Sequence, residues 1–138
     1  MDAGVGGAII PVSSTFWQTL GIELEAGRVF TATESVDPGP GAAIVSRRVA
    51  GRLWPDQSGV GRVVRAVEPG GTVEYRVVGV APNLVYEEIG EQTDQSQLAM
   101  YVPHGRRPYR TLAALIRASG DPASLLPPAR AAVRAIDP

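Results

Sequence analysis

The stretch RVVRAVEPGGTVEYRVVGVA, residues 62–81, decides the fold. Two segments rich in valine, residues 62–68 and 73–81, flank the short sequence PGGT. Branched side chains favour extended backbone, and a glycine-rich turn between two such segments is typical of an antiparallel hairpin. We therefore expect a β-hairpin in the middle of the chain, with Gly70 and Gly71 at its exposed turn.

The segments on the N-terminal side of this hairpin alternate between strand and helix patterns. They predict, in order, a strand at 6–13, a helix at 14–21, a strand at 42–45 and a helix at 46–54. The first helix is closed by Gly21, in the position where helices commonly end on a glycine. In the second helix, Val45, Val49 and Leu53 recur every four residues and form one apolar face.

The C-terminal side of the hairpin predicts a polar and acidic loop at 83–97, strands at 98–103 and 110–118, and a final helix at 121–137. In that helix Ala129, Val133 and Ile136 fall on one stripe with Leu125 or Leu126, and we expect the stripe to face the core. Together the segments predict a single α+β domain over residues 1–138. We expect a mixed sheet with a central β-hairpin and two or three short helices packed on it.

Composition excludes several classes of function. The chain has 138 residues, of which 44% are hydrophobic and 20% charged, as is usual for a folded domain. Its thirteen cationic side chains nearly balance fourteen carboxylates, so there is no charge excess that would favour nucleic acid. It has no cysteine, which excludes disulfides and thiolate sites. No apolar run approaches the roughly 20 residues of a membrane-spanning helix, so we expect no direct membrane insertion of this segment.

The residues that could act in catalysis or bind a ligand do not form a recognisable motif in the sequence. His104 is the only histidine, and it stands in a turn without an acidic neighbour in sequence. Glu87 and Glu88 are adjacent, so their side chains would diverge on either a strand or a helix. Gly59 and Gly61 follow a helical segment, whereas phosphate-binding glycines precede one. We therefore expect no enzyme activity, no catalytic residue, no cofactor and no metal site.

Five blocks of sequence follow one another in an order that points to a known family. They are VSSTFWQTLGIELEAGRVFTATE (12–34), AAIVSRRVAGRLWPDQSGVGRVVR (42–65), YRVVGVAPNL (75–84), AMYVPHG (99–105) and LIRASGDPASLLPPARAAVRAIDP (115–138). In combination they resemble the MacB-like periplasmic core domain of ABC-transporter permeases of the FtsX and MacB type. The resemblance covers nearly the whole chain from Val12 onward.

This resemblance implies a location, a role and partners. The chain would begin inside the domain and be a fragment of a longer membrane permease, on the periplasmic or extracytoplasmic face of a bacterial inner membrane. Such a domain has no active site. It would couple the motion driven by a cytoplasmic ATPase to export or to an extracytoplasmic partner. Its partners would be the rest of the permease and its ATPase, and a periplasmic adaptor or another extracytoplasmic protein.

Two exposed segments are the candidates for partner contact. One is the hairpin turn at Gly70 and Gly71, and the other is the acidic loop that contains Tyr86, Glu87, Glu88 and Glu91. An alternative function uses the same loop. In that case the chain is a small-ligand-binding extracytoplasmic sensor domain, and residues 86–97 close over a pocket beside the hairpin.

Overall fold

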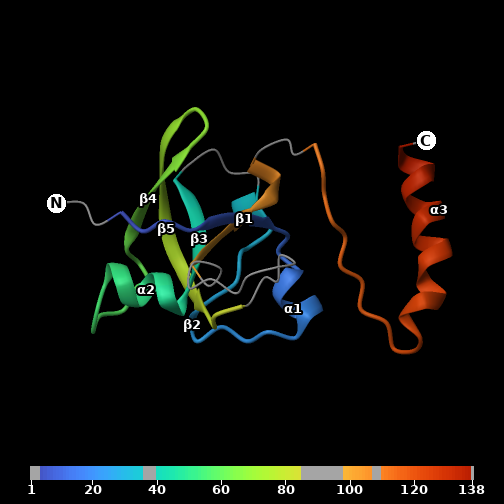
Figure 1. Ribbon diagram of the computed structural model, residues 1–138, viewed down its shortest axis with the longest axis horizontal. Helices are drawn as coiled ribbons and strands as arrows, with labels where there is room; N and C mark the ends of the chain where they lie inside the picture. The colour runs from blue at the N-terminus through green and yellow to red at the C-terminus, as the bar shows by residue number, and fades with distance from the viewer. Residues whose placement is uncertain (1–3, 36–39, 85–97, 107–109, 138) are drawn as a thin grey trace.

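The computed structural model describes residues 4–35, 40–84, 98–106 and 110–137. These residues form a mixed β-sheet, with helices beside it and a C-terminal segment that stands apart (Figure 1). The strands are β1 (Ala8–Val12), β2 (Ala26–Gly27), β3 (Gly41–Ser46), β4 (Val63–Glu68), β5 (Gly71–Ala81) and β6 (Ala99–Pro103). In the described part of the chain their order is β1-β6-β3-β5-β2, with β4 also paired to β5.

Strand β3 lies at the centre of this sheet. It runs parallel to β5 on one side and antiparallel to β6 on the other, and β1 then pairs parallel with β6. The far edge of β5 is shared, because β4 pairs with residues 71–76 and β2 with residues 79 and 80. The sheet therefore contains both parallel and antiparallel pairs, which confirms the predicted mixed sheet.

The predicted hairpin is formed by β4 and β5. Val64 lies opposite Tyr75, and Glu68 lies opposite Gly71 where the strands meet the turn. Gly70 has a φ of 118°, a backbone conformation that a side chain would strain, so the turn needs glycine at this position. The hairpin extends beyond the rest of the sheet (Figure 1).

Gly79 allows β2 and its flanking residues to approach β5 closely. A Cβ atom at this position would lie 2.8 Å from the Arg28 carbonyl oxygen and 2.8 Å from Leu24 Cδ1. Both distances are shorter than a normal contact. The VVGV segment of β5 therefore carries glycine because there is no room for a side chain there.

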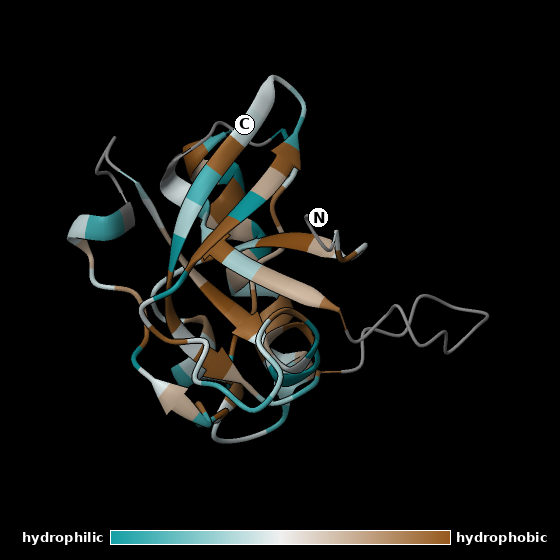
Figure 2. Cartoon of the chain, turned by 90° about the vertical axis from the view of Figure 1, so that its left-hand side faces the viewer, coloured by the Kyte–Doolittle hydropathy of each residue, from teal (hydrophilic) through white to brown (hydrophobic). Residues whose placement is uncertain are grey.

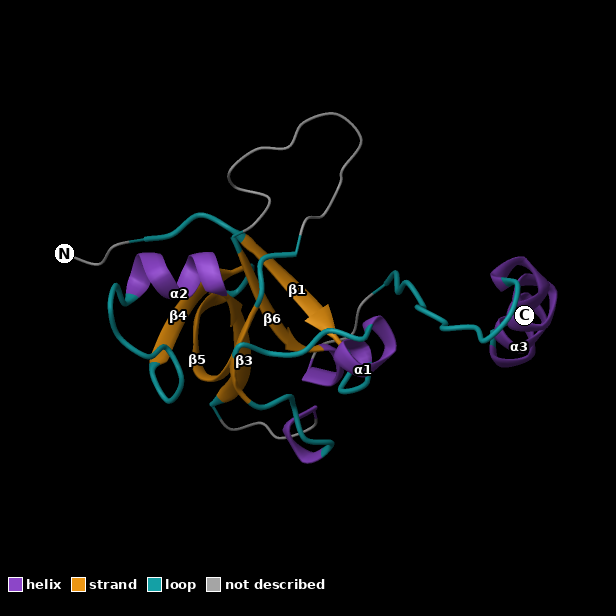
Figure 3. Ribbon diagram, turned by 90° about the horizontal axis from the view of Figure 1, so that it is seen from below, coloured by secondary structure: helices purple, strands orange, loops and turns teal. Residues whose placement is uncertain are grey.

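Two helices cover opposite faces of the sheet: α1 (Phe16–Leu20) and α2 (Arg47–Leu53). On one face Val49 of α2 packs with Val45, Val77 and Met100. On the other face α1 places Trp17 in a cluster of buried side chains that also contains Val12, Phe30, Ile44 and Tyr101. All six residues of β3 are buried, since alternate side chains point into the two clusters. Figure 2 shows the hydrophobic strands gathered at the centre, and Figure 3 shows the two helices on either side of them.

Ser46 connects β3, α2 and β6. Its side chain is fully buried, and its hydroxyl oxygen accepts hydrogen bonds from the Val49 N–H at 3.4 Å and the Ala99 N–H at 3.3 Å. The first bond caps the N-terminus of α2. The second fixes the start of β6 against the end of β3, so one hydroxyl joins three elements.

The C-terminal segment departs from the sequence-based expectation. Residues 110–118 were expected to form a strand, but the structure assigns them no strand, and the chain continues through a 3-10 turn, η3 (Pro122–Leu125), into α3 (Leu126–Ile136). The expectation that Val133 faces the core is wrong, since 62% of this side chain is exposed. The apolar residues of α3 do line up on one side of the helix. Among the described helices, however, only α1 and α2 pack on the sheet. We call residues 110–137 the C-terminal arm.

Two further 3-10 turns, η1 (Thr33–Ser35) and η2 (His104–Arg106), lie in loops beside the sheet. Asp121 Oδ1 caps η3 by accepting a hydrogen bond from the Ala123 N–H at 3.0 Å. Among the helices of the described residues, none has the length and apolar character needed to cross a bilayer.

Candidate functional site

The hairpin turn is the first candidate surface. Gly70 and Gly71 are exposed, and apart from the adjacent residues of the chain no atom lies within 4 Å of the place where a Cβ would be at either residue. The other predicted contact residues, Tyr86, Glu87, Glu88 and Glu91, lie outside the described residues. The structure therefore places Gly70 and Gly71 on an exposed turn, and partner contact by this turn or by the loop stays a prediction.

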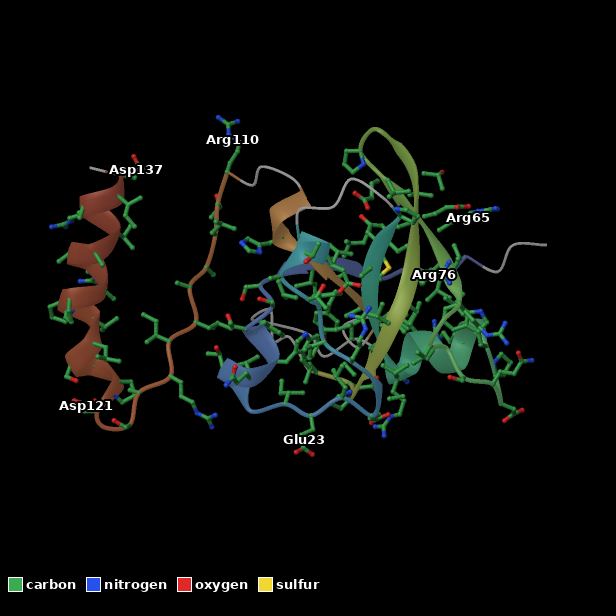
Figure 4. All side chains as sticks on the ribbon, turned by 180° about the vertical axis from the view of Figure 1, so that it is seen from behind. Glu23, Arg65, Arg76, Arg110, Asp121 and Asp137 are labelled. Atoms are coloured by element: carbon green, nitrogen blue, oxygen red, sulfur yellow. The ribbon has the colours of Figure 1, made fainter. Side chains whose placement is uncertain are left out.

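The outward face of the hairpin is mixed in character. Arg65 on β4 pairs with Glu74 on β5, with 2.9 Å between Arg65 Nε and Glu74 Oε1. Arg76 lies on the same face, and its guanidinium donates to the Gly61 carbonyl at 3.3 Å. Beside these charges Val63 and Val67 are 49% and 85% exposed. Figure 4 shows Arg65 and Arg76 at the outside of the hairpin, so this face offers both charge and apolar surface to a partner.

The opposite face of the hairpin is braced internally. Tyr75 is buried in the cluster beneath α2, and its hydroxyl donates to Glu68 Oε1 at 2.5 Å. This bond joins the two strands close to the turn. The hairpin is thus tied to the core by a buried aromatic ring and by continuous strand pairing.

The side chains that could carry chemistry are not assembled in the described residues. No group of three or more His, Cys, Asp or Glu side chains there could hold a metal ion. His104 lies in η2, and its Nδ1 atom is buried without a hydrogen-bond partner in that part of the chain. A general base needs a group that orients it, and His104 has none among the described side chains. The indole Nε1 of Trp17 is likewise buried without a described partner.

One carboxylate has a strongly shifted pKa. Glu34 Oε1 and Oε2 accept hydrogen bonds of 2.8 and 2.9 Å from the Arg28 guanidinium, and Oε2 also accepts the Thr31 N–H at 2.9 Å. The Arg28 bonds, and to a smaller extent the Thr31 N–H, lower the pKa of Glu34 from 4.5 to about 2. The same pairing raises the pKa of Arg28. This pair closes the loop that follows β2, and its geometry explains the shift as a structural effect.

The C-terminal arm is a second candidate surface, which the sequence reasoning missed. It carries most of the large hydrophobic side chains that are exposed in the described residues: Leu112, Leu115, Ile116, Leu126, Val133 and Ile136. Figures 1 and 4 show α3 standing away from the sheet, with Arg110 and Asp121 marking the two ends of the preceding extended segment. A periodic apolar stripe predicts a helix with one buried face. The sequence contains no local signal that would distinguish an exposed stripe from a buried one.

The sequence matches the MacB-like periplasmic core domain family over residues 2–137. The chain belongs to this family. It is thus a periplasmic domain of the type found in ABC-transporter permeases, and this family of transporter domains is not a family of enzymes. The family resemblance inferred from the sequence is confirmed.

Solved structures support the same fold. The periplasmic region of MacB from Actinobacillus actinomycetemcomitans matches with a TM-score of 0.66 at 12% identity, covering 96% of this chain and 58% of that one. The extracellular domain of the noncanonic ABC-type transporter YknZ from Gram-positive bacteria matches with a TM-score of 0.50 at 25% identity, covering 70% and 42%. The chain therefore spans about half the length of these solved regions. Among curated proteins no sequence matches it.

Proposed function

We propose that this chain is the extracytoplasmic part of a longer membrane permease, and that it passes ATPase-driven motion to a partner outside the bilayer. The observation that carries the proposal is the hairpin. Its strand β5 extends for 11 residues from the exposed turn to its pairing with the central strand β3. Residues 71–76 of β5 pair with β4 and residues 75–81 pair with β3, so a displacement of the turn would pass along β5 to the sheet. Family membership supports the transporter context.

The proposed partners lie on the two sides of the domain between which the motion would pass. On the membrane side they are the rest of the permease and a cytoplasmic ATPase, in the inner membrane of a bacterium. On the outer side the partner is a periplasmic adaptor or another extracytoplasmic protein, which contacts the outward face of the hairpin. The exposed Val67 and the Arg65–Glu74 pair give that face the mixed character of a transient protein interface.

A reversible cross-link tests this coupling. The chain has no native cysteine, so a Thr72→Cys substitution on the exposed face of β5 can be paired with a cysteine in the adjoining part of the full-length permease. Thr72 is preferable to Gly70 or Gly71, whose positive φ values disfavour a side chain. We expect oxidation to lower transport and alter ATP turnover, and reduction to restore both.

The permease that carries Thr72→Cys without the second introduced cysteine, oxidised in the same way, is the matched control and should keep its activity. Cross-linked permease that transports and hydrolyses ATP at the reduced rate would contradict the coupling role. The small-ligand sensor function would then be favoured. It is tested separately, because a ligand at 100 times its Kd should raise the stability of the chain by about 2.7 kcal/mol.

A further inference from the structure

The C-terminal arm lacks the contacts that a strand and a helix normally need. In the described residues its extended segment 111–118 takes part in no strand pairing, so its backbone N–H and C=O groups are open on both edges. The Arg117 side chain lies next to the end of α1, since a Cβ atom built on Gly21 would be 3.2 Å from Arg117 Nη1. The segment thus lies beside α1 at Arg117, but none of its described residues joins the sheet.

The apolar side chains of the arm are arranged as if for burial. Leu112 and Ile116 share one face of the extended segment, while Leu115 lies on the other, which is the pattern of a strand covered on both sides. On α3, Leu126, Val133 and Ile136 form a stripe together with the half-buried Ala129. All of the large side chains in this set are at least half exposed. The arm therefore presents a strand and an amphipathic helix without the layer that would cover them.

An 11-residue helix is marginal in water on its own, and a lone strand is not stable. The matching region of MacB covers 96% of this chain, so the match includes most of the arm, and 42% of that region lies outside the match. The MacB region thus contains polypeptide beyond the part that matches this chain. That polypeptide can supply the missing layer.

The charge of the arm argues against a second copy as the covering layer. Residues 110–137 contain four arginines and two aspartates, so two arms packed together would bring like charges near each other. We infer that the arm docks on another segment of the same permease's extracytoplasmic region. That segment offers an open strand edge to residues 111–118, an apolar face to Val133 and Ile136, and an acidic rim to Arg130 and Arg134. This inference rests on the proposal that the chain is part of a longer permease.

Cysteine labelling tests the docking directly. Val133→Cys lies on the apolar stripe, and the matched control Ala131→Cys lies on the opposite side of the same helix. In the 138-residue chain we expect a maleimide to label both cysteines at similar rates. In the full-length permease we expect labelling of Val133→Cys to slow by about tenfold or more, because a docked side chain reacts only when the contact opens. Labelling of Ala131→Cys should change by less than about twofold.

Equal labelling of Val133→Cys in the two proteins would overturn the inference. Slow labelling in the isolated chain that becomes fast on dilution would instead assign the face to a second copy. A photo-crosslinking residue in place of Leu112 then locates the contact. We expect adducts with permease segments outside this chain, and adducts with the chain's own sheet would contradict the docking. These readouts need no transport activity, so they hold even where the coupling proposal fails.

Discussion

Glu34 shows how a single surface carboxylate can make stability depend on pH. Its pKa is about 2 in the folded chain, below its ordinary value of 4.5, so the unfolded state takes up the proton first as the pH falls. The stabilisation is therefore fully present above about pH 4.5 and is lost as the pH falls toward 2. Arg28 is half exposed, which limits the effect at pH 7 to about 1 kcal/mol.

We expect Glu34→Gln to lower the free energy of unfolding by about 1 kcal/mol at pH 7, and the difference from the wild-type chain to shrink between pH 5 and pH 2. Urea titrations at several pH values measure this difference. Glu23→Gln is the control, since Glu23 is exposed and points away from the domain (Figure 4). A Glu34→Gln effect that stays constant over this pH range would show that the carboxylate charge is not its source.

For Ser46 and Gly79 the sequence predicted the local structure but not the contacts with distant parts of the chain. The sequence placed the start of a helix at residue 46, and the structure has α2 begin one residue later. The bond from the Ala99 N–H to Ser46 spans 53 positions, so it depends on β6 lying next to β3, which no local pattern encodes. The VVGV segment predicted a strand. The close approach of Arg28 and Leu24 to Gly79 became visible only in the folded chain.

At the scale of elements, local patterns predicted what local interactions determine. The hairpin of β4 and β5 followed from the sequence because its strands are adjacent in the chain and its turn requires glycine. Strands β1, β3 and β6 and helices α1 and α2 also lie where their periodicity placed them. The arm did not follow the same rule. Its pattern encodes burial, but the surface that would bury it is not among the described residues.

The different environments of α2 and α3 lead to a mutational prediction. Val49 on α2 is 7% exposed within the core, whereas Val133 on α3 is 62% exposed. In the isolated chain we expect Val49→Asp to cost about 3 kcal/mol or more, because it buries an unpaired charge. We expect Val133→Asp to change the free energy of unfolding by no more than about 0.5 kcal/mol. Urea unfolding followed by circular dichroism measures both, and equal losses would place Val133 in the core.

At the scale of the whole molecule, the domain consists of a two-sided core and an arm that this core does not cover. One cluster of buried side chains lies between the sheet and α2, and another lies between the sheet and α1. Each face of the sheet is therefore covered by a helix. The hairpin turn and the arm are separate projections from this body (Figure 1). A packed body with two exposed extensions suits a domain that contacts other segments of a larger assembly through those extensions.

Hydrogen exchange distinguishes these regions within one sample. In the isolated chain we expect the backbone amides of β3 and β6 to exchange only when the body opens, because every residue of β3 is buried and paired with β5 and every residue of β6 is buried and paired with β1. The amides of α3 should exchange orders of magnitude faster, because a short helix without a packed face opens at little cost in free energy. Mass spectrometry of peptic peptides reads both regions in the same time course. Protection of α3 equal to that of β3 would mean that the arm packs on the sheet in solution, and the docking surface inferred for the permease would then be occupied by the domain itself.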